Sequence, residues 1–163
     1  MAREYSVGAL NVSVNAAVDL AWVFINPGTT CSLEFLRAWA SQAANATSAQ
    51  QSIALRSQVT AFPTLTSATP RKLKLLDPAS QITGGTAGAA GTAGTNASVA
   101  GAGAKSEILD DNFNVLNGWL WVPTPRETII MNASAASGLG LYAPVQPATL
   151  TSWSFGMNFG ELG

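Results

Sequence analysis

Carboxylates are the residues best suited to chemistry in this 163-residue chain, because the sequence has no histidine and one cysteine. Its densest acidic run reads Glu107-Ile-Leu-Asp-Asp-Asn-Phe-Asn114, and such oxygen ligands suit a hard cation such as calcium. The run lacks the central glycine and the closing glutamate of an EF-hand loop. We therefore expect a solvated turn that leads into a strand rather than a metal site, and no cofactor.

Hydroxyl groups are the other abundant reactive type. Without histidine, a serine or threonine nucleophile would need a lysine, a carboxylate or an N-terminal amine as its base. Lys72, Lys74 and Lys105 occur in no Ser-x-x-Lys arrangement. Asp77 and Glu127 could form a glycosidase-like pair if the fold brought them together, but nothing in the sequence requires it. The sequence predicts a protein that is not an enzyme.

Glycines and basic residues suggest two further sites. Glycines 84, 85, 88 and 91 are not followed by the Gly-Lys-Ser/Thr of a phosphate-binding loop. The basic cluster of Arg71, Lys72 and Lys74 has two interpretations, and the favoured one is protection of an edge strand from further pairing. The other is a docking site for an acidic surface of a partner protein.

The tryptophans could also form a binding surface, since aromatic rings stack on sugars. Four of the five fall on apolar faces of predicted strands, so we expect them in the core or in a subunit interface. The five are Trp22, Trp39, Trp119, Trp121 and Trp153.

Composition limits the partners of the chain. With 8 basic and 9 acidic residues the net charge is -1, which gives no field that would concentrate nucleic acid or an anionic membrane surface. No apolar run approaches the roughly 20 residues of a membrane-spanning helix. The length suits one domain, residues 1–163, and only 10% of its residues are charged.

Most of the chain alternates between apolar and polar residues, which predicts strands separated by turns. The clearest case is Trp153-Ser-Phe-Gly-Met-Asn-Phe159, in which every second residue is large and apolar. Two half-buried strands are expected near residues 10–14 and 18–24, with Leu10 on the apolar face. Residues 33–45 are rich in alanine but also fit a two-residue period, and we favour a strand over a helix. Further strands are expected at 53–60, 119–121, 128–132, 139–143 and 153–159.

Residues 81–104 interrupt this pattern with a glycine, alanine and threonine-rich segment. Its side chains bury little apolar area and its glycines lose much entropy on ordering, so we expect a long flexible loop or arm. Such an arm either orders on a neighbouring subunit or remains a mobile surface insertion. The predicted fold is therefore all-β, an antiparallel two-sheet β-sandwich of the jelly-roll kind, and an open barrel is the second choice.

Several motifs resemble a known group of proteins. They are Arg3-Glu-Tyr-Ser-Val7, Asn11-Val-Ser-Val-Asn-Ala-Ala-Val-Asp-Leu20, Asn112-Phe-Asn-Val115, Gly118-Trp-Leu-Trp-Val-Pro-Thr-Pro125 and Glu161-Leu-Gly163. In this order they resemble small virion structural proteins of tailed bacteriophages, and the most specific is the motif that begins at Gly118. The resemblance implies a jelly-roll capsid decoration, or cement, protein on the outer surface of the virion.

That resemblance implies a mechanical role with two partners, the major capsid protein of the phage head and further copies of the chain in a homotrimer. Many weak contacts would act together to stabilise the shell. The candidate contact residues are Ala2, Arg3, Glu4, Arg71, Lys72 and Lys74, together with the 81–104 arm. A carbohydrate-binding or host-attachment module of a fibre or tail tip is the alternative, and it would expose aromatic rings on an open face.

Overall fold

The computed structural model describes residues 3–43 and 47–162. Within those residues the chain forms thirteen strands and no helix. The strands are β1 (Arg3–Val12), β2 (Leu20–Ile25), β3 (Ser32–Gln42), β4 (Gln50–Val59), β5 (Thr64–Ser67), β6 (Arg71–Lys72), β7 (Thr83–Gly84), β8 (Thr92–Val99), β9 (Ala104–Asn114), β10 (Trp119–Trp121), β11 (Ile129–Met131), β12 (Ser137–Ala143) and β13 (Trp153–Leu162).

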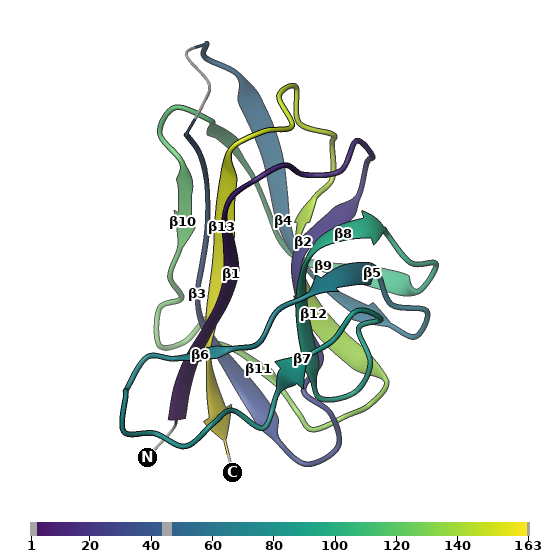
Figure 1. The fold of residues 1–163 in the computed structure, drawn as a ribbon, viewed down its shortest axis with the longest axis vertical. Helices are drawn as coiled ribbons and strands as arrows, with labels where there is room; N and C mark the ends of the chain where they lie inside the picture. The colour runs from purple at the N-terminus through teal and green to yellow at the C-terminus, as the bar shows by residue number, and fades with distance from the viewer. Residues whose placement is uncertain (1–2, 44–46, 163) are drawn as a thin grey trace.

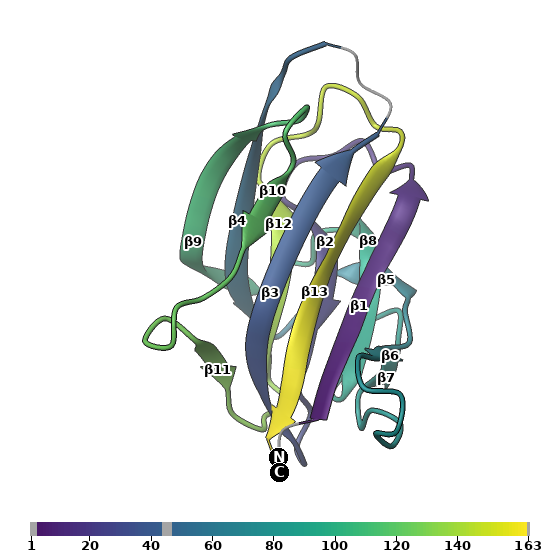
Figure 2. The same ribbon diagram turned by 90° about the vertical axis from the view of Figure 1, so that its left-hand side faces the viewer.

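Two sheets pack face to face, as the alternating sequence predicts (Figures 1 and 2). Sheet A has the order β10-β3-β13-β1-β6, and β11 also pairs with β3. Sheet B has the order β5-β8-β2-β12-β4-β9, and β7 pairs with β8. All the strand pairs are antiparallel except the short β7–β8 pair. The prediction of an all-β antiparallel two-sheet sandwich is confirmed.

The last two long strands complete the two sheets. β13 lies between β1 and β3, while β12 lies between β2 and β4. Their apolar side chains meet in one core between the sheets, where Trp22, Trp153 and Phe155 are fully buried. The indole of Trp22 lies 4.6 Å from that of Trp153 and stacks at 5.3 Å on the ring of Phe155. Burial of such large rings is the main source of stability in the fold.

The prediction that residues 81–104 form a flexible loop or arm is wrong for residues 92–99. Residues 92–99 form β8, a central strand of sheet B that pairs with both β2 and β5. Small residues allow β8 to approach its neighbours closely, because a Cβ atom on Gly94 would lie 2.6 Å from the Cβ of Leu65. Close packing against neighbouring strands, rather than flexibility, explains the small residues in this strand.

The first two strands differ from the prediction in their burial. Leu10 is 82% exposed, because β1 reverses its inward face at an irregularity between Ala9 and Val12 where Asn11 has a φ of 54°. Such a bulge shifts the alternation by one residue. β2 was expected to be half-buried and is instead buried on both faces. Its second face joins a smaller cluster that contains Phe24 and Tyr142.

The strand expected within residues 33–45 is confirmed over its main part as β3, although residues 44–46 lie outside the described residues. A register shift opposite Asn158 and Phe159 again reverses the inward face. Leu33 and Phe35 are therefore buried in the core, while Trp39 lies on the outer face of sheet A. Of the two places expected for the tryptophans, the core and a subunit interface, the core is therefore excluded for Trp39.

Candidate functional site

The structure brings together the two groups of residues that the sequence marked as candidate contacts. β6 pairs with β1, so that Lys72 lies opposite Tyr5 and Arg71 opposite Ser6. The pairing continues beyond β6, where the Leu73 N–H donates to the Glu4 carbonyl at 3.0 Å and Lys74 Nζ lies 3.1 Å from Glu4 Oε1. Ala2 lies outside the described residues. Arg3, Glu4, Arg71, Lys72 and Lys74 thus form one edge of sheet A.

A buried carboxylate, Glu161, holds this edge in place. Its Oε1 accepts hydrogen bonds from Ser80 Oγ at 2.6 Å and from the Gln81 N–H at 2.7 Å, and its Oε2 lies 3.3 Å from the Arg3 guanidinium. Arg3 is therefore engaged within the chain. The sequence carried a signal for Glu161, because it continues the inward phase of Trp153, Phe155, Met157 and Phe159. A carboxylate at an inward position requires partners.

Residues 73–76 follow β6 and form a loop with exposed leucines, here called the 73–76 loop. Leu75 is 87% exposed and Leu76 is 101% exposed, which is as open as in a free chain. Both ends of the loop are fixed, since Glu4 binds Leu73 and Lys74 while the Tyr5 hydroxyl donates to the Pro78 carbonyl at 3.1 Å. Adjacent leucines held in solvent on a fixed base are typical of a protein contact surface.

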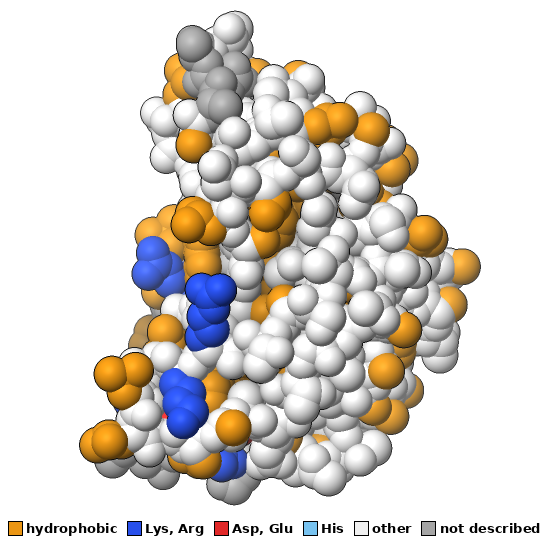
Figure 3. Space-filling view, viewed as in Figure 1, with side chains coloured by type: hydrophobic (Ala, Val, Ile, Leu, Met, Phe, Trp, Pro, Cys, Tyr) orange, Lys and Arg blue, Asp and Glu red, His pale blue; other side chains and the backbone are white. Residues whose placement is uncertain are grey.

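The outer face of sheet A lies beside this edge and is open in Figure 2. In Figure 3, basic side chains gather along the side of the molecule where this sheet lies. Two of the basic residues, Arg37 and Arg71, belong to the same cross-strand row, and Trp39 occupies the next row. Sequence alternation alone missed this face, because the bulge in β3 is what turns Trp39 outward.

The residues considered for catalysis are not assembled into a site. Asp77 follows β6 at one edge of sheet A, while Glu127 lies between β10 and β11 at the opposite edge. The acidic run at 107–114 lies in strand β9 instead of the expected turn. Within it, Asp111 Oδ2 accepts the Trp119 indole N–H at 2.9 Å and Glu107 Oε1 lies 2.6 Å from the Arg56 guanidinium. No group of three potential metal ligands occurs among the described residues.

Asp19 is the centre of an ion-pair cluster on sheet B. It forms ion pairs with both Arg56 and Lys105, and the Lys105 ammonium lies 5.5 Å from the centre of the Tyr142 ring. The Tyr142 hydroxyl donates to Gln58 Oε1 at 2.5 Å. Burial, followed by the nearby Asp19 carboxylate, raises the pKa of Tyr142 far above its ordinary value. A raised pKa keeps this tyrosine protonated, so that its hydroxyl remains a donor to Gln58.

Cys31 is a buried thiol whose chemistry is suppressed. It donates weakly to the Ser32 carbonyl at 3.4 Å, and burial together with the Glu161 carboxylate raises its pKa. The thiolate is the reactive form, so a raised pKa keeps the side chain inert.

We expect Cys31 in the folded protein to react with an aromatic disulfide reagent about a hundredfold more slowly than in urea, and to remain slow up to about pH 8.5. Absorbance of the released thiol measures both rates. Rapid, complete labelling of the folded protein at neutral pH would contradict this assignment of the thiol.

No helix long and apolar enough to cross a membrane occurs in the described part of the chain. Comparisons with protein-family models, with curated protein sequences and with solved structures find no match.

Proposed function

We propose that the chain is a capsid decoration protein that binds the outer surface of an assembled phage head and stabilises contacts between major capsid protein subunits. The observation that carries the proposal is the 73–76 loop, with Leu75 and Leu76 fully open to solvent on a fixed base. The loop adjoins the contact residues Arg3, Glu4, Lys72 and Lys74. The resemblance of the motifs from Arg3 to Gly163 to small virion proteins of tailed bacteriophages supports the assignment to a virion.

The surface chemistry suits such a role. A contact centre that is apolar and rimmed by charge is common in protein interfaces, and here Lys72 and Lys74 border the leucines. Burial of two leucines contributes about 3 kcal/mol or more, which is modest for one copy. On a shell with many identical sites, and within a homotrimer, such contacts act together and give firm attachment. Binding only the assembled shell stabilises that shell by mass action.

Replacement of Leu75 and Leu76 by serine tests the proposal. The double variant Leu75→Ser/Leu76→Ser is expected to weaken binding to purified heads that lack the protein by more than about a hundredfold per site, because about 3 kcal/mol of apolar burial is lost. Co-sedimentation of the protein with the heads measures this binding. Light scattering of the isolated protein measures whether it is a trimer.

The matched control is Val18→Ser/Val145→Ser, which removes two other exposed apolar side chains, 61% and 55% exposed, away from the loop. It is expected to bind as the unmodified chain does. Equal binding by both double variants would refute the contact at the 73–76 loop, and failure of the unmodified chain to bind heads would refute decoration itself.

A further inference from the structure

The outer face of sheet A carries two ordered rows of side chains. In one row, Arg37 of β3 lies opposite Asn158 of β13, which lies opposite Ser6 of β1, which lies opposite Arg71 of β6. With neighbouring strands about 4.8 Å apart, the two arginine positions lie about 14 Å from each other across the face. Such a row offers a cation at each end and an amide and a hydroxyl between them.

The next row is an aromatic surface laid on glycines. Trp39 lies opposite Gly156, which in turn lies opposite Gly8. A Cβ atom on Gly156 would lie 2.2 Å from Cζ2 of Trp39, and one on Gly8 would lie 2.4 Å from the Phe155 carbonyl oxygen. The indole therefore rests directly on the backbone of β13, where any other residue would displace it. The Arg37 guanidinium lies 5.6 Å from the centre of the indole ring.

The arginines of this face are uncommitted among the described residues. Arg71 makes no ion pair or side-chain hydrogen bond there, and Arg37 makes only its contact with Trp39. Asn158 Oδ1 is buried without a hydrogen-bond partner. Acidic residues stay one row away, where Glu4 is paired with Lys74 and Glu34 lies opposite Gly160. The two arginines thus have no ion-pair partner among the described residues, while the Glu34 carboxylate, which makes no ion pair there either, lies one row from Arg37.

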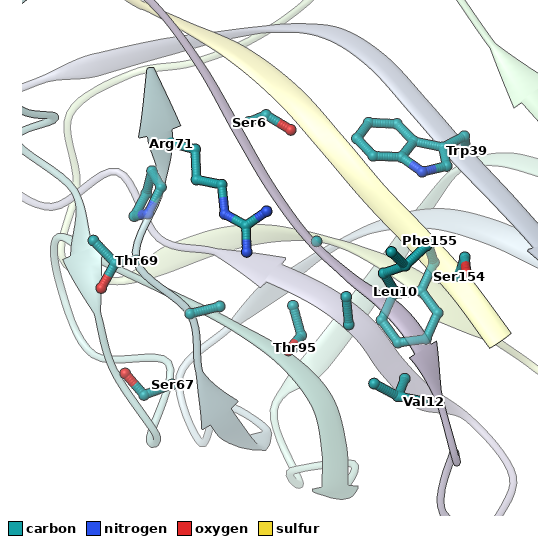
Figure 4. Close-up of a pocket in the computed structure, with 14 residues that line it drawn as sticks. Ser6, Leu10, Val12, Trp39, Ser67, Thr69, Arg71, Thr95, Ser154 and Phe155 are labelled. Carbon is teal, nitrogen blue, oxygen red and sulfur yellow. The ribbon is translucent and has the colours of Figure 1, made fainter. Parts of the chain in front are cut away.

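A hollow of about 740 Å³ extends the face past Arg71 (Figure 4). Arg71 and Trp39 both line it, and the Arg71 side chain extends into it in the close-up. Its other polar lining consists of hydroxyl groups, from Ser6, Ser67, Thr69, Thr95 and Ser154. Thr95 belongs to β8 of sheet B and is only 4% exposed, so the hollow reaches from the outer face of sheet A to the other sheet.

We propose that this face binds an oligosaccharide that carries carboxylate groups. Trp39 offers a flat apolar surface to a sugar ring, Asn158 and the hydroxyls suit sugar hydroxyl groups, and Arg71 with Arg37 binds the carboxylates. The combination of an indole ring, neutral polar groups and two arginines indicates an acidic saccharide rather than another class of anionic ligand. A nucleic acid is held mainly by many phosphate contacts, which two arginines on a chain of net charge -1 do not supply. The saccharide site adjoins the 73–76 loop, because Leu73 lines a hollow together with Arg37, Trp39 and Asn158. The saccharide proposal nevertheless rests on these side chains alone and does not depend on the capsid proposal.

Calorimetric titration of the isolated protein tests the site, using a tetramer of galacturonic acid as the probe and a tetramer of galactose as its neutral counterpart. We expect the acidic tetramer to bind with a Kd below about 1 mM and the neutral one at least about tenfold more weakly. Trp39→Ala is expected to weaken binding of the acidic tetramer at least about tenfold, and Arg71→Gln at least about fivefold.

Arg126→Gln, which removes an exposed arginine between β10 and β11, is the matched control and is expected to leave the Kd within about twofold. Circular dichroism of each variant checks that it is folded, which is expected because Trp39 and Arg71 lie outside the core. No binding of the acidic tetramer, equal binding of both tetramers, or undiminished binding by folded Trp39→Ala or Arg71→Gln would overturn the proposal. None of these outcomes bears on attachment to phage heads.

Discussion

Trp153→Ala is expected to lower the free energy of unfolding by about 3 to 5 kcal/mol, the usual cost of truncating a buried tryptophan. Its ring is fully buried between the sheets, 4.6 Å from the Trp22 ring and 6.4 Å from the Phe113 ring. Its indole N–H donates to the Thr149 carbonyl at 2.7 Å. The variant therefore loses apolar burial, two ring contacts and a hydrogen bond at once. Urea unfolding followed by circular dichroism measures the change.

Trp39→Ala is the matched comparison, since it removes the same side chain from the outer face of sheet A. We expect it to cost less than about 1.5 kcal/mol, because Trp39 lies on the surface of the sheet and leaves no cavity in the core. Equal losses of stability in the two variants would mean that the inward and outward faces of the strands have been assigned wrongly.

Glu161→Ala is expected to cost about 3 kcal/mol, because it leaves the Ser80 hydroxyl and the Gln81 N–H without their acceptor. These bonds join the end of β13 to the segment that follows the 73–76 loop. The variant is thus expected to loosen this loop as well, which hydrogen exchange at residues 73–81 would detect. Urea unfolding measures the loss of stability.

Glu127→Ala is the control for this experiment. Glu127 is exposed, and within the described residues its carboxylate accepts only the Thr124 hydroxyl at 2.9 Å. Its removal is therefore expected to change stability by less than about 0.5 kcal/mol. If Glu161→Ala were as mild as Glu127→Ala, Glu161 would not anchor the edge that carries the contact residues.

Much of the fold could be predicted from local alternation. The last strand, from Trp153 to Phe159, has its large residues on the core side as the period of two requires. The alanine-rich β3 is also a strand, because its partner β13 and the edge strands β10 and β11 complete its hydrogen bonds. Tertiary pairing outweighed the helical preference of its alanines.

The rest depended on long-range geometry. Bulges in β1 and β3 reverse which side chains face inward, and these reversals expose Leu10 and Trp39. Composition indicated a loop for residues 92–99, but small side chains also suit a closely packed central strand. The contacts of Glu4 with Lys74 and of Glu161 with Ser80 join residues 70 and 81 positions apart, which no local pattern reveals. The candidate contact residues were predicted separately, and only the fold makes them one edge.

Electron microscopy of intact phage particles, with this chain located in the map, tests the proposed function most directly. Decoration predicts density for the β-sandwich on the outer surface of the head, with the 73–76 loop against the major capsid protein. Density at the tail tip, or particles that contain none of this chain, would contradict it.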